Sequence, residues 1–179
     1  MIETFAVATP IGAVTLTVRD GNLAKLAFSD DRVKAEDPIQ SPAARAIAGR
    51  LRDYFDGALD ALDAIPVAAE GTPFQKRVWR ALREIPVGET VAYGELARRI
   101  GRPGAARAVA RANATNPVAV VVPCNRVIGD DDKLRGYAFG LSRKEWLLAH
   151  EGALVARTAA RSKRSTGAAV SPAHSARRA

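Results

Sequence analysis

The sequence predicts an α+β fold in which a small N-terminal α/β domain is followed by a mainly helical C-terminal domain. Three short apolar-rich segments, 2–7, 13–18 and 23–28, are separated by turn signals and predict an antiparallel sheet. After about residue 72, apolar residues recur at helical spacing. Two of the later helical segments are joined by a glycine-containing turn, which is typical of a helix–turn–helix.

One helix is predicted after the three strands. Ser41 is followed by Pro42, a pairing typical of a helix N-terminus, and Gly57 is suited to end the helix. A further short strand is possible at 65–67. No group of potentially catalytic side chains stands out in residues 1–71, so we expect a structural domain with a linker at its end.

The second domain, residues 72–152, opens with a strong helix signal. Thr72 and Gln75 stand at the spacing of a capping box, in which each side chain bonds to the other residue's backbone N–H. The helix–turn–helix is predicted from helices at 93–100 and 105–113.

The last helix of this domain is predicted at 146–150. Ser142 and Glu145 have the spacing of a capping box that would open it. Residues 153–179 are rich in Ala, Ser, Arg and Thr without periodicity, so we expect a basic, disordered tail.

The charge is unevenly distributed along the chain. The net charge is +8, but residues 1–73 carry 7 basic and 11 acidic side chains, whereas residues 74–112 carry 9 and 3. The tail carries 6 basic side chains and no acidic one, which would add nonspecific attraction to DNA. Such asymmetry favours a nucleic-acid face, although a solvated helical surface would look similar.

No segment of the chain predicts export or membrane insertion. No apolar run reaches the roughly 18 residues of a membrane span, and no secretory signal precedes the first strand. The chain has one cysteine, so an intramolecular disulfide is impossible. We expect a monomer in the cytoplasm with its thiol reduced and no contact with a membrane.

That cysteine, Cys124, follows an unusual apolar run. Residues 118–122 include four valines and predict a buried strand, which Pro123 would end because proline cannot donate a ladder hydrogen bond. Taken alone, Cys124 reads more readily as a buried small hydrophobe than as a reactive thiol.

The surrounding residues change this reading. Pro123-Cys124-Asn125-Arg126-Val127 resembles the Pro-Cys-His-Arg-Val active-site motif of the O6-alkylguanine-DNA alkyltransferases, also called methylated-DNA–protein-cysteine methyltransferases. An Asn-Pro pair at 116–117 precedes it at the family's spacing, and the resemblance extends from about residue 72 to 152. It implies a ribonuclease H-like first domain and a winged-helix-like second domain.

The resemblance also implies the catalytic roles. Cys124 corresponds to the alkyl acceptor and Glu151 to the glutamate of a Cys–water–His–Glu relay. Tyr93 corresponds to the tyrosine that protonates the leaving guanine, and Asn116 to an asparagine that orders the turn beneath the active site. Asn125 replaces the relay histidine; an amide can orient a water molecule but cannot accept and hold a proton.

A DNA face and a guanine pocket are implied as well. The helix at 105–113 is mostly alanine, which allows close approach to a surface, with two arginines one turn apart that can reach phosphates or bases. The family's intercalating arginine matches Arg107. The remaining expected DNA contacts are Ala105, Ala106, Arg111 and Arg126, and the expected pocket residues are Tyr93, Val127, Tyr137 and Gly140.

The resemblance implies irreversible DNA repair without a metal or cofactor. The alkyl group of O6-alkylguanine in double-stranded DNA would move to Cys124, with O4-methylthymine as a second candidate lesion. Because Asn125 replaces the histidine, a non-catalytic protein that binds and flags alkylated bases is an alternative. A regulator that uses only the helix–turn–helix is another, but it leaves Cys124 and Glu151 unexplained.

Overall fold

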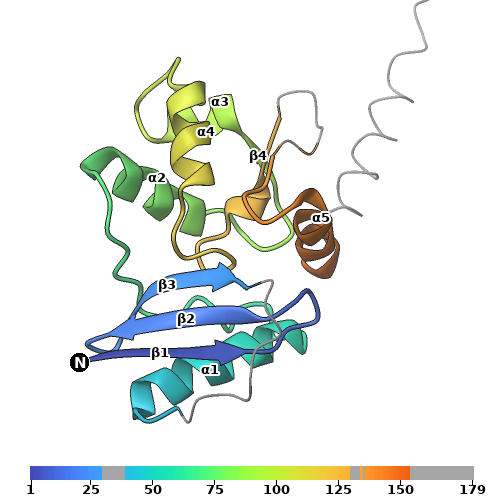
Figure 1. The fold of residues 1–179 in the computed structure, drawn as a ribbon. Coiled ribbons are helices and arrows are strands. Elements are labelled where there is room, and N and C mark those ends of the chain that lie inside the picture. The colour runs from blue at the N-terminus through green and yellow to red at the C-terminus, as the bar shows by residue number, and fades with distance from the viewer. Residues whose placement is uncertain (30–38, 130–133, 135, 154–179) are drawn as a thin grey trace, which may run out of the picture.

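The structure, a computed structural model, describes residues 1–29, 39–129, 134 and 136–153. In the view of Figure 1, helix α1 lies below the three-stranded sheet, beside β1, and the other helices lie above it, beyond β3. No helix within these ranges is long and apolar enough to cross a membrane. The predicted α+β class is confirmed.

The antiparallel sheet is confirmed with small shifts of boundary. It consists of β1 (Ile2–Val7), β2 (Val14–Arg19) and β3 (Asn22–Phe28), in the order β1-β2-β3. Alternate side chains such as Phe5, Leu16 and Leu26 are buried, as expected for a sheet with one face on a core. The segment 65–67 contributes a single bridge from Val67 to Leu23 and no strand.

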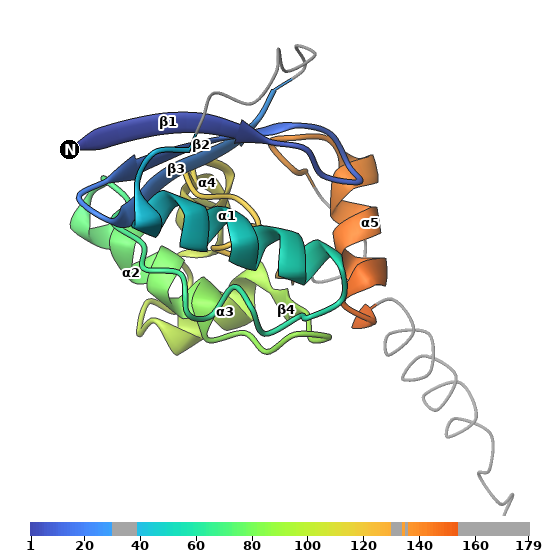
Figure 2. The ribbon, with the colours of Figure 1, turned by 90° about the horizontal axis from the view of Figure 1, so that it is seen from below.

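Helix α1 (Pro42–Phe55) lies along the sheet (Figures 1 and 2). Ser41 caps it by accepting a hydrogen bond from the backbone N–H of Ala44 at 3.1 Å. Gly57, just beyond its end, has a φ of 110°, a backbone conformation that disfavours side chains with a Cβ. Both helix signals are therefore confirmed.

Three helices follow the linker: α2 (Pro73–Arg83), α3 (Tyr93–Arg99) and α4 (Ala106–Ala114). Thr72 forms the predicted capping box of α2. The indole Nε1–H of Trp79 in α2 donates to the Ala112 carbonyl of α4 at 2.9 Å, which fixes these two helices against each other. Helices α3 and α4 form the predicted pair joined by a glycine-containing turn.

The apolar run before the cysteine is a buried turn, so the predicted strand at 118–122 is wrong. Val118 makes one isolated bridge, to Leu26, and Val120 has a φ of 70°, which is rare for a β-branched residue. The Asn116 side chain accepts from the Val118 N–H at 3.0 Å and donates to the Val122 carbonyl at 2.8 Å. These two bonds close the segment into a loop that an apolar composition alone could not reveal.

The chain after this turn contains elements that were not predicted. A short 3-10 helix (Cys124–Arg126) leads into β5 (Val127–Ile128), which pairs in parallel with β4 (Val91–Ala92). Helix α5 (Leu141–His150) begins earlier than expected. Its N-cap is Gly140 without a side-chain bond, so the predicted capping box at Ser142 is wrong because Ser142 already lies within the helix.

The buried apolar side chains form one cluster that draws on the sheet, α1 and the later helices. The division at residues 71 and 72 stays a prediction. The predicted disordered tail begins at Ala153, which the structure describes as buried at 1% exposure, so the prediction is wrong for this residue. Residues 154–179 lie outside the described residues.

Candidate active site

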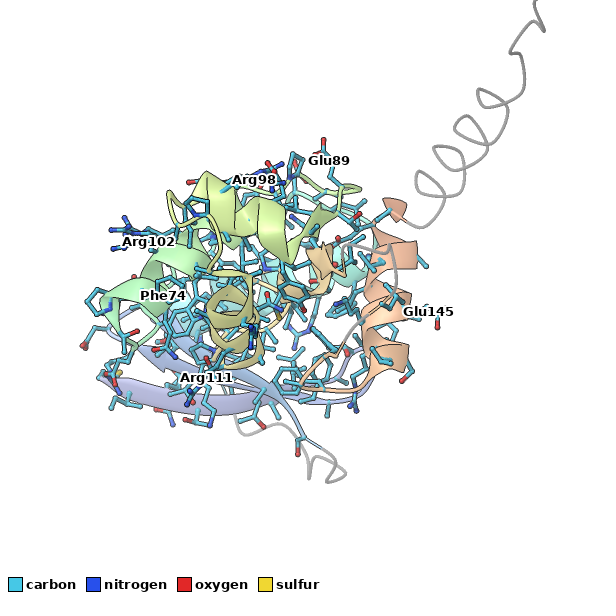
Figure 3. All side chains as sticks on the ribbon, turned by 90° about the horizontal axis from the view of Figure 1, so that it is seen from above. Phe74, Glu89, Arg98, Arg102, Arg111 and Glu145 are labelled. Atoms are coloured by element: carbon cyan, nitrogen blue, oxygen red, sulfur yellow. The ribbon has the colours of Figure 1, made fainter. Side chains whose placement is uncertain are left out.

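Cys124 lies at the floor of a cavity of about 450 Å³. One wall is α4 and the other is the segment 136–139 (both visible in Figure 3 beside α5). The thiol residue itself is only 3% exposed. The lining residues are Tyr93, Ala110, Asn113, Ala114, Asn116, Cys124, Gly136, Tyr137, Ala138 and Phe139.

The surroundings of Cys124 act in two directions on its thiol. Burial is the largest effect and raises the pKa of Cys124 above its usual value. The nearby polar side chains of Asn116 and Tyr137 and the positive charge of Lys144 oppose that rise in pKa. Burial prevails, so the resting cysteine is a thiol, and the same three side chains are placed to stabilise the thiolate once the proton has left.

Two buried polar atoms in the cavity wall have no hydrogen-bond partner among the described residues: Asn113 Oδ1 and the Tyr137 hydroxyl. Tyr93, also in the wall, has its pKa raised by burial and by the nearby Cys124, which keeps its hydroxyl protonated. Buried polar groups are costly without partners. The cavity therefore presents hydrogen-bonding groups that a polar ring such as guanine could satisfy.

Asn113 was not anticipated from the sequence. Its Nδ2 donates to the Cys124 carbonyl at 3.3 Å, which ties α4 to the nucleophile's backbone. The available signal is its position on α4: it lies four residues after the buried Val109 and therefore on the same inward face.

Glu151 does not face the thiol as a free carboxylate. Arg126 donates to both of its oxygens, from Nε at 2.9 Å and from Nη2 at 3.1 Å. The Tyr54 hydroxyl donates at 2.7 Å and Asn125 Nδ2 at 3.4 Å. The Arg126 and Glu151 side chains are 7% and 1% exposed, so this is a buried ion pair with four donors on one carboxylate.

This network changes the role expected for Arg126. Its guanidinium also donates to the Ile85 carbonyl at 2.6 Å and is enclosed by protein, so the expected contact with DNA does not agree with its position. The burial of Arg126 could not be read from the motif. Tyr54, 97 residues before Glu151, also had no sequence signal.

His150 does not replace the missing histidine. Its Nε2 lies 2.8 Å from the Tyr54 carbonyl, and its ring stacks on Trp146 at 4.8 Å between centroids. The Oδ1 atom of Asn125 is buried and has no partner among the described residues.

The other expected pocket residues divide into two groups. Tyr137 lines the cavity, whereas Val127 is fully buried in β5, where its carbonyl accepts from Lys144 Nζ at 2.6 Å. Gly140 is the N-cap of α5, and its N–H donates to the Tyr137 carbonyl at 3.0 Å. Val127 and Gly140 therefore support the wall without lining the cavity.

The wall at 136–139 is held against the N-terminal sheet. Phe139 packs on Tyr137 at 5.7 Å between ring centroids and on Phe28 of β3 at 5.3 Å. The Arg143 guanidinium lies over the Phe28 ring at 4.7 Å and donates to the Ile11 carbonyl at 2.9 Å. The first part of the chain thus sets the position of one side of the cavity.

The expected DNA-contacting residues lie on α4 and its start. Arg107 and Arg111 are exposed one turn apart, and Ala105 and Ala106 are half-buried at the beginning of the helix. Figure 3 shows Arg111 projecting from α4 toward solvent. The exposed face of α4 adjoins the cavity, because Ala110 and Ala114 line it.

Comparisons with known proteins show which family this chain resembles. The profile "6-O-methylguanine DNA methyltransferase, DNA binding domain" matches residues 73–153. Proteins named methylated-DNA–protein-cysteine methyltransferase match from Shigella flexneri, at 50% identity over 70% of both chains, and from Mycolicibacterium paratuberculosis, at 50% identity over 84% of this chain and 93% of that protein.

Solved structures are also similar. The crystal structure of the Mycobacterium tuberculosis O6-methylguanine methyltransferase aligns with a TM-score of 0.73 at 40% identity, covering 85% of this chain and 93% of that one. A structure of Mycobacterium tuberculosis OGT in complex with DNA aligns with a TM-score of 0.72 at 42% identity, covering 82% and 91%. On the strength of these sequence matches, this chain belongs to the methylated-DNA–protein-cysteine methyltransferase family.

Proposed function

We propose that this protein repairs O6-alkylguanine in double-stranded DNA by moving the alkyl group onto its own Cys124. The observation that carries the proposal is the position of the chain's one cysteine, at the floor of a cavity beside an exposed, arginine-bearing helix. The Sγ–carbon bond forms as the carbon–O6 bond breaks. Guanine leaves with a proton, and the thioether remains on the protein, so each molecule acts once.

The donor of guanine's proton is Tyr93, which then regains a proton from solvent. Burial and the nearby Cys124 raise its pKa, so the hydroxyl is protonated when the reaction begins. In the cavity wall, Asn113 Oδ1 and the Tyr137 hydroxyl, which have no partner among the described residues, can bond to the edge of the base.

The thiol proton takes a different route from that of relatives with a histidine. Asn125 cannot carry a proton, and Glu151 already accepts from four donors. The thiol therefore loses its proton to solvent. Asn116, Tyr137 and Lys144 stabilise the thiolate that remains, since each of them lowers the pKa of Cys124.

The reacting base reaches the cavity only after it leaves the duplex, at a cost of a few kcal/mol. The small residues at the start of α4 permit a close approach to the groove, and Arg107 fills the space that the extruded base vacates.

O4-methylthymine is a second lesion of this reaction class. We propose that the protein works as a monomer in the cytoplasm.

A non-catalytic lesion-binding protein is the less favoured candidate, because Cys124 is retained at the cavity floor. Intact-mass measurement after incubation with a duplex containing one O6-methylguanine tests the proposal. The protein should gain the mass of one methyl group in exchange for a hydrogen. Cys124→Ala should bind the same duplex with no gain in mass; an adduct on this variant, or binding without an adduct by the wild type, would contradict the assignment.

A further inference from the structure

Helix α2 carries a cationic surface that the proposed reaction does not use. Lys76, Arg77 and Arg80 are exposed on its outer side. In the part of the chain that the structure describes, none of them has a carboxylate within 4.0 Å. By contrast, Arg98 and Arg99 of α3 both pair with Glu95. Three like charges side by side repel one another and favour an anionic partner.

The outer side of α2 adjoins a hollow that fits such a partner. A depression of about 350 Å³ lies between α2 and α3 and is lined by Arg77, Arg80, Ala81, Glu84, Arg99 and Ile100. Three of these residues carry a guanidinium and only Glu84 carries a carboxylate. Arginine is suited to phosphate because its planar guanidinium presents a fork of donors.

This surface lies on a different side of α2 from the side that packs against α4. The buried side of α2 contacts α4 through Trp79, whose indole bonds to the carbonyl of Ala112. Residues 76, 77 and 80 lie on the side of α2 opposite the buried residues 78, 79 and 82, with the buried Ala81 at the edge of that side. The exposed side of α2 therefore differs from the side that packs against α4. In Figure 3, α2, marked by Phe74, and α5, marked by Glu145, lie on opposite sides of α4.

We propose that Lys76, Arg77 and Arg80 form a second DNA-binding surface, which holds phosphates outside the segment engaged by α4. This inference rests on the proposed function in one respect, that the protein meets DNA. Double-stranded DNA is the favoured occupant because its phosphates present a continuous row of negative charge, matching a row of cations that continues into the arginine-lined hollow. The contact would be independent of sequence and would keep the protein on DNA between encounters with lesions.

The test compares the triple variant Lys76→Gln, Arg77→Gln, Arg80→Gln with the wild type and a matched control. The control, Lys25→Gln, Arg45→Gln, Arg50→Gln, also removes one lysine and two arginines, all exposed, from β3 and α1. Binding is measured across a range of salt concentrations on two undamaged duplexes. One has about 12 base pairs, little more than one helical turn, and the other about 30.

On the long duplex, the α2 variant should lose at least about tenfold in affinity near 0.1 M salt. The slope of log affinity against log salt should fall in magnitude by about 2–3, since each phosphate contact contributes about 0.9. On the short duplex it should match the wild type, and the control should match the wild type on both. All three proteins should react equally with free O6-benzylguanine, which shows that they are folded.

Three results would overturn the inference. One is a salt slope of the α2 variant on the long duplex that equals the slope of the wild type, as expected if the surface is merely solvated or binds an acidic protein. Another is an equal loss of affinity of the α2 variant on both duplexes, which would place the contact within the segment of DNA engaged by α4. The third is an equal loss of DNA affinity in the control variant, which would show that the effect comes from net charge alone. Failure of the wild type to alkylate Cys124 would instead count against the proposed function.

Discussion

Removing the charge of Arg126 should destabilise the protein more than any other single change near the cysteine. In Arg126→Met, a side chain of similar length leaves Glu151 as a buried carboxylate, 1% exposed, without its counter-charge. Tyr54 and Asn125 would still donate to that carboxylate, but neither carries a charge. Breaking a buried ion pair by removing one partner costs about 3–5 kcal/mol.

That loss can be expressed as a melting temperature. For a chain of this length, 1 kcal/mol corresponds to about 2–4 °C, so Arg126→Met should lower Tm by about 6–20 °C. Glu151→Gln removes the carboxylate charge while retaining an acceptor for Tyr54. The double variant should therefore be more stable than the sum of the two single losses predicts.

Urea unfolding of the wild type, both single variants and the double variant gives the coupling energy between the two side chains. We expect at least about 2 kcal/mol, because no buried charge is left unpaired in the double variant. Single losses that add to the double loss within about 0.5 kcal/mol would refute the reasoning, since that is the behaviour of independent sites. A loss of less than about 1 kcal/mol in the free energy of unfolding of Arg126→Met alone would also refute the reasoning, because losses of that size are typical of exposed ion pairs.

Four further outcomes are expected. Arg107→Ala should slow repair in duplex DNA at least about tenfold more than reaction with free O6-benzylguanine, which needs no base extrusion; equal slowing would place Arg107 in the fold or the pocket. Wild-type transfer should accelerate as pH rises from neutral past about 8.5, the usual cysteine pKa, because burial raises the pKa of Cys124. Asn125→His should raise the neutral-pH rate by up to about 10², and flat pre-steady-state profiles for both proteins would count against this role of Asn125. Because the pKa of Cys124 is raised in the folded protein, only the unfolded chain has an ionised Cys124 thiol just above about pH 8.5. The contribution of this thiol to the free energy of unfolding should therefore be full below that pH and fall above it. Urea unfolding at pH 7 and pH 9.5 should show that the free energy of unfolding falls less in Cys124→Ala than in the wild type. Equal falls in the two proteins would indicate that the thiol does not contribute.

The sequence by itself determined the parts of this protein that depend on near neighbours. Ser41 and Thr72 start helices where expected, because a cap bonds to a backbone group only three residues away. Strand β2 and the second half of β1 alternate between buried and partly exposed positions because the pleat of a strand has a period of two residues. In β3 the buried Leu23 and Leu26 are three residues apart, where the pairing with β2 is irregular. The motif around Cys124, together with the resemblance that extends from about residue 72 to 152, indicated the family, which the comparisons confirm.

The tertiary structure alone decided how the chain surrounds that cysteine. The valines at 118–122 are as compatible with a buried turn as with a strand. Two hydrogen bonds of the Asn116 side chain stabilise the turn. Arg126 appears in the sequence as a basic residue available to DNA, yet its partner Glu151 lies 25 residues away and encloses it. Tyr54 reaches the same carboxylate across 97 residues. Local patterns do not encode such contacts, because burial of a charge is favourable only when the folded chain supplies its partners.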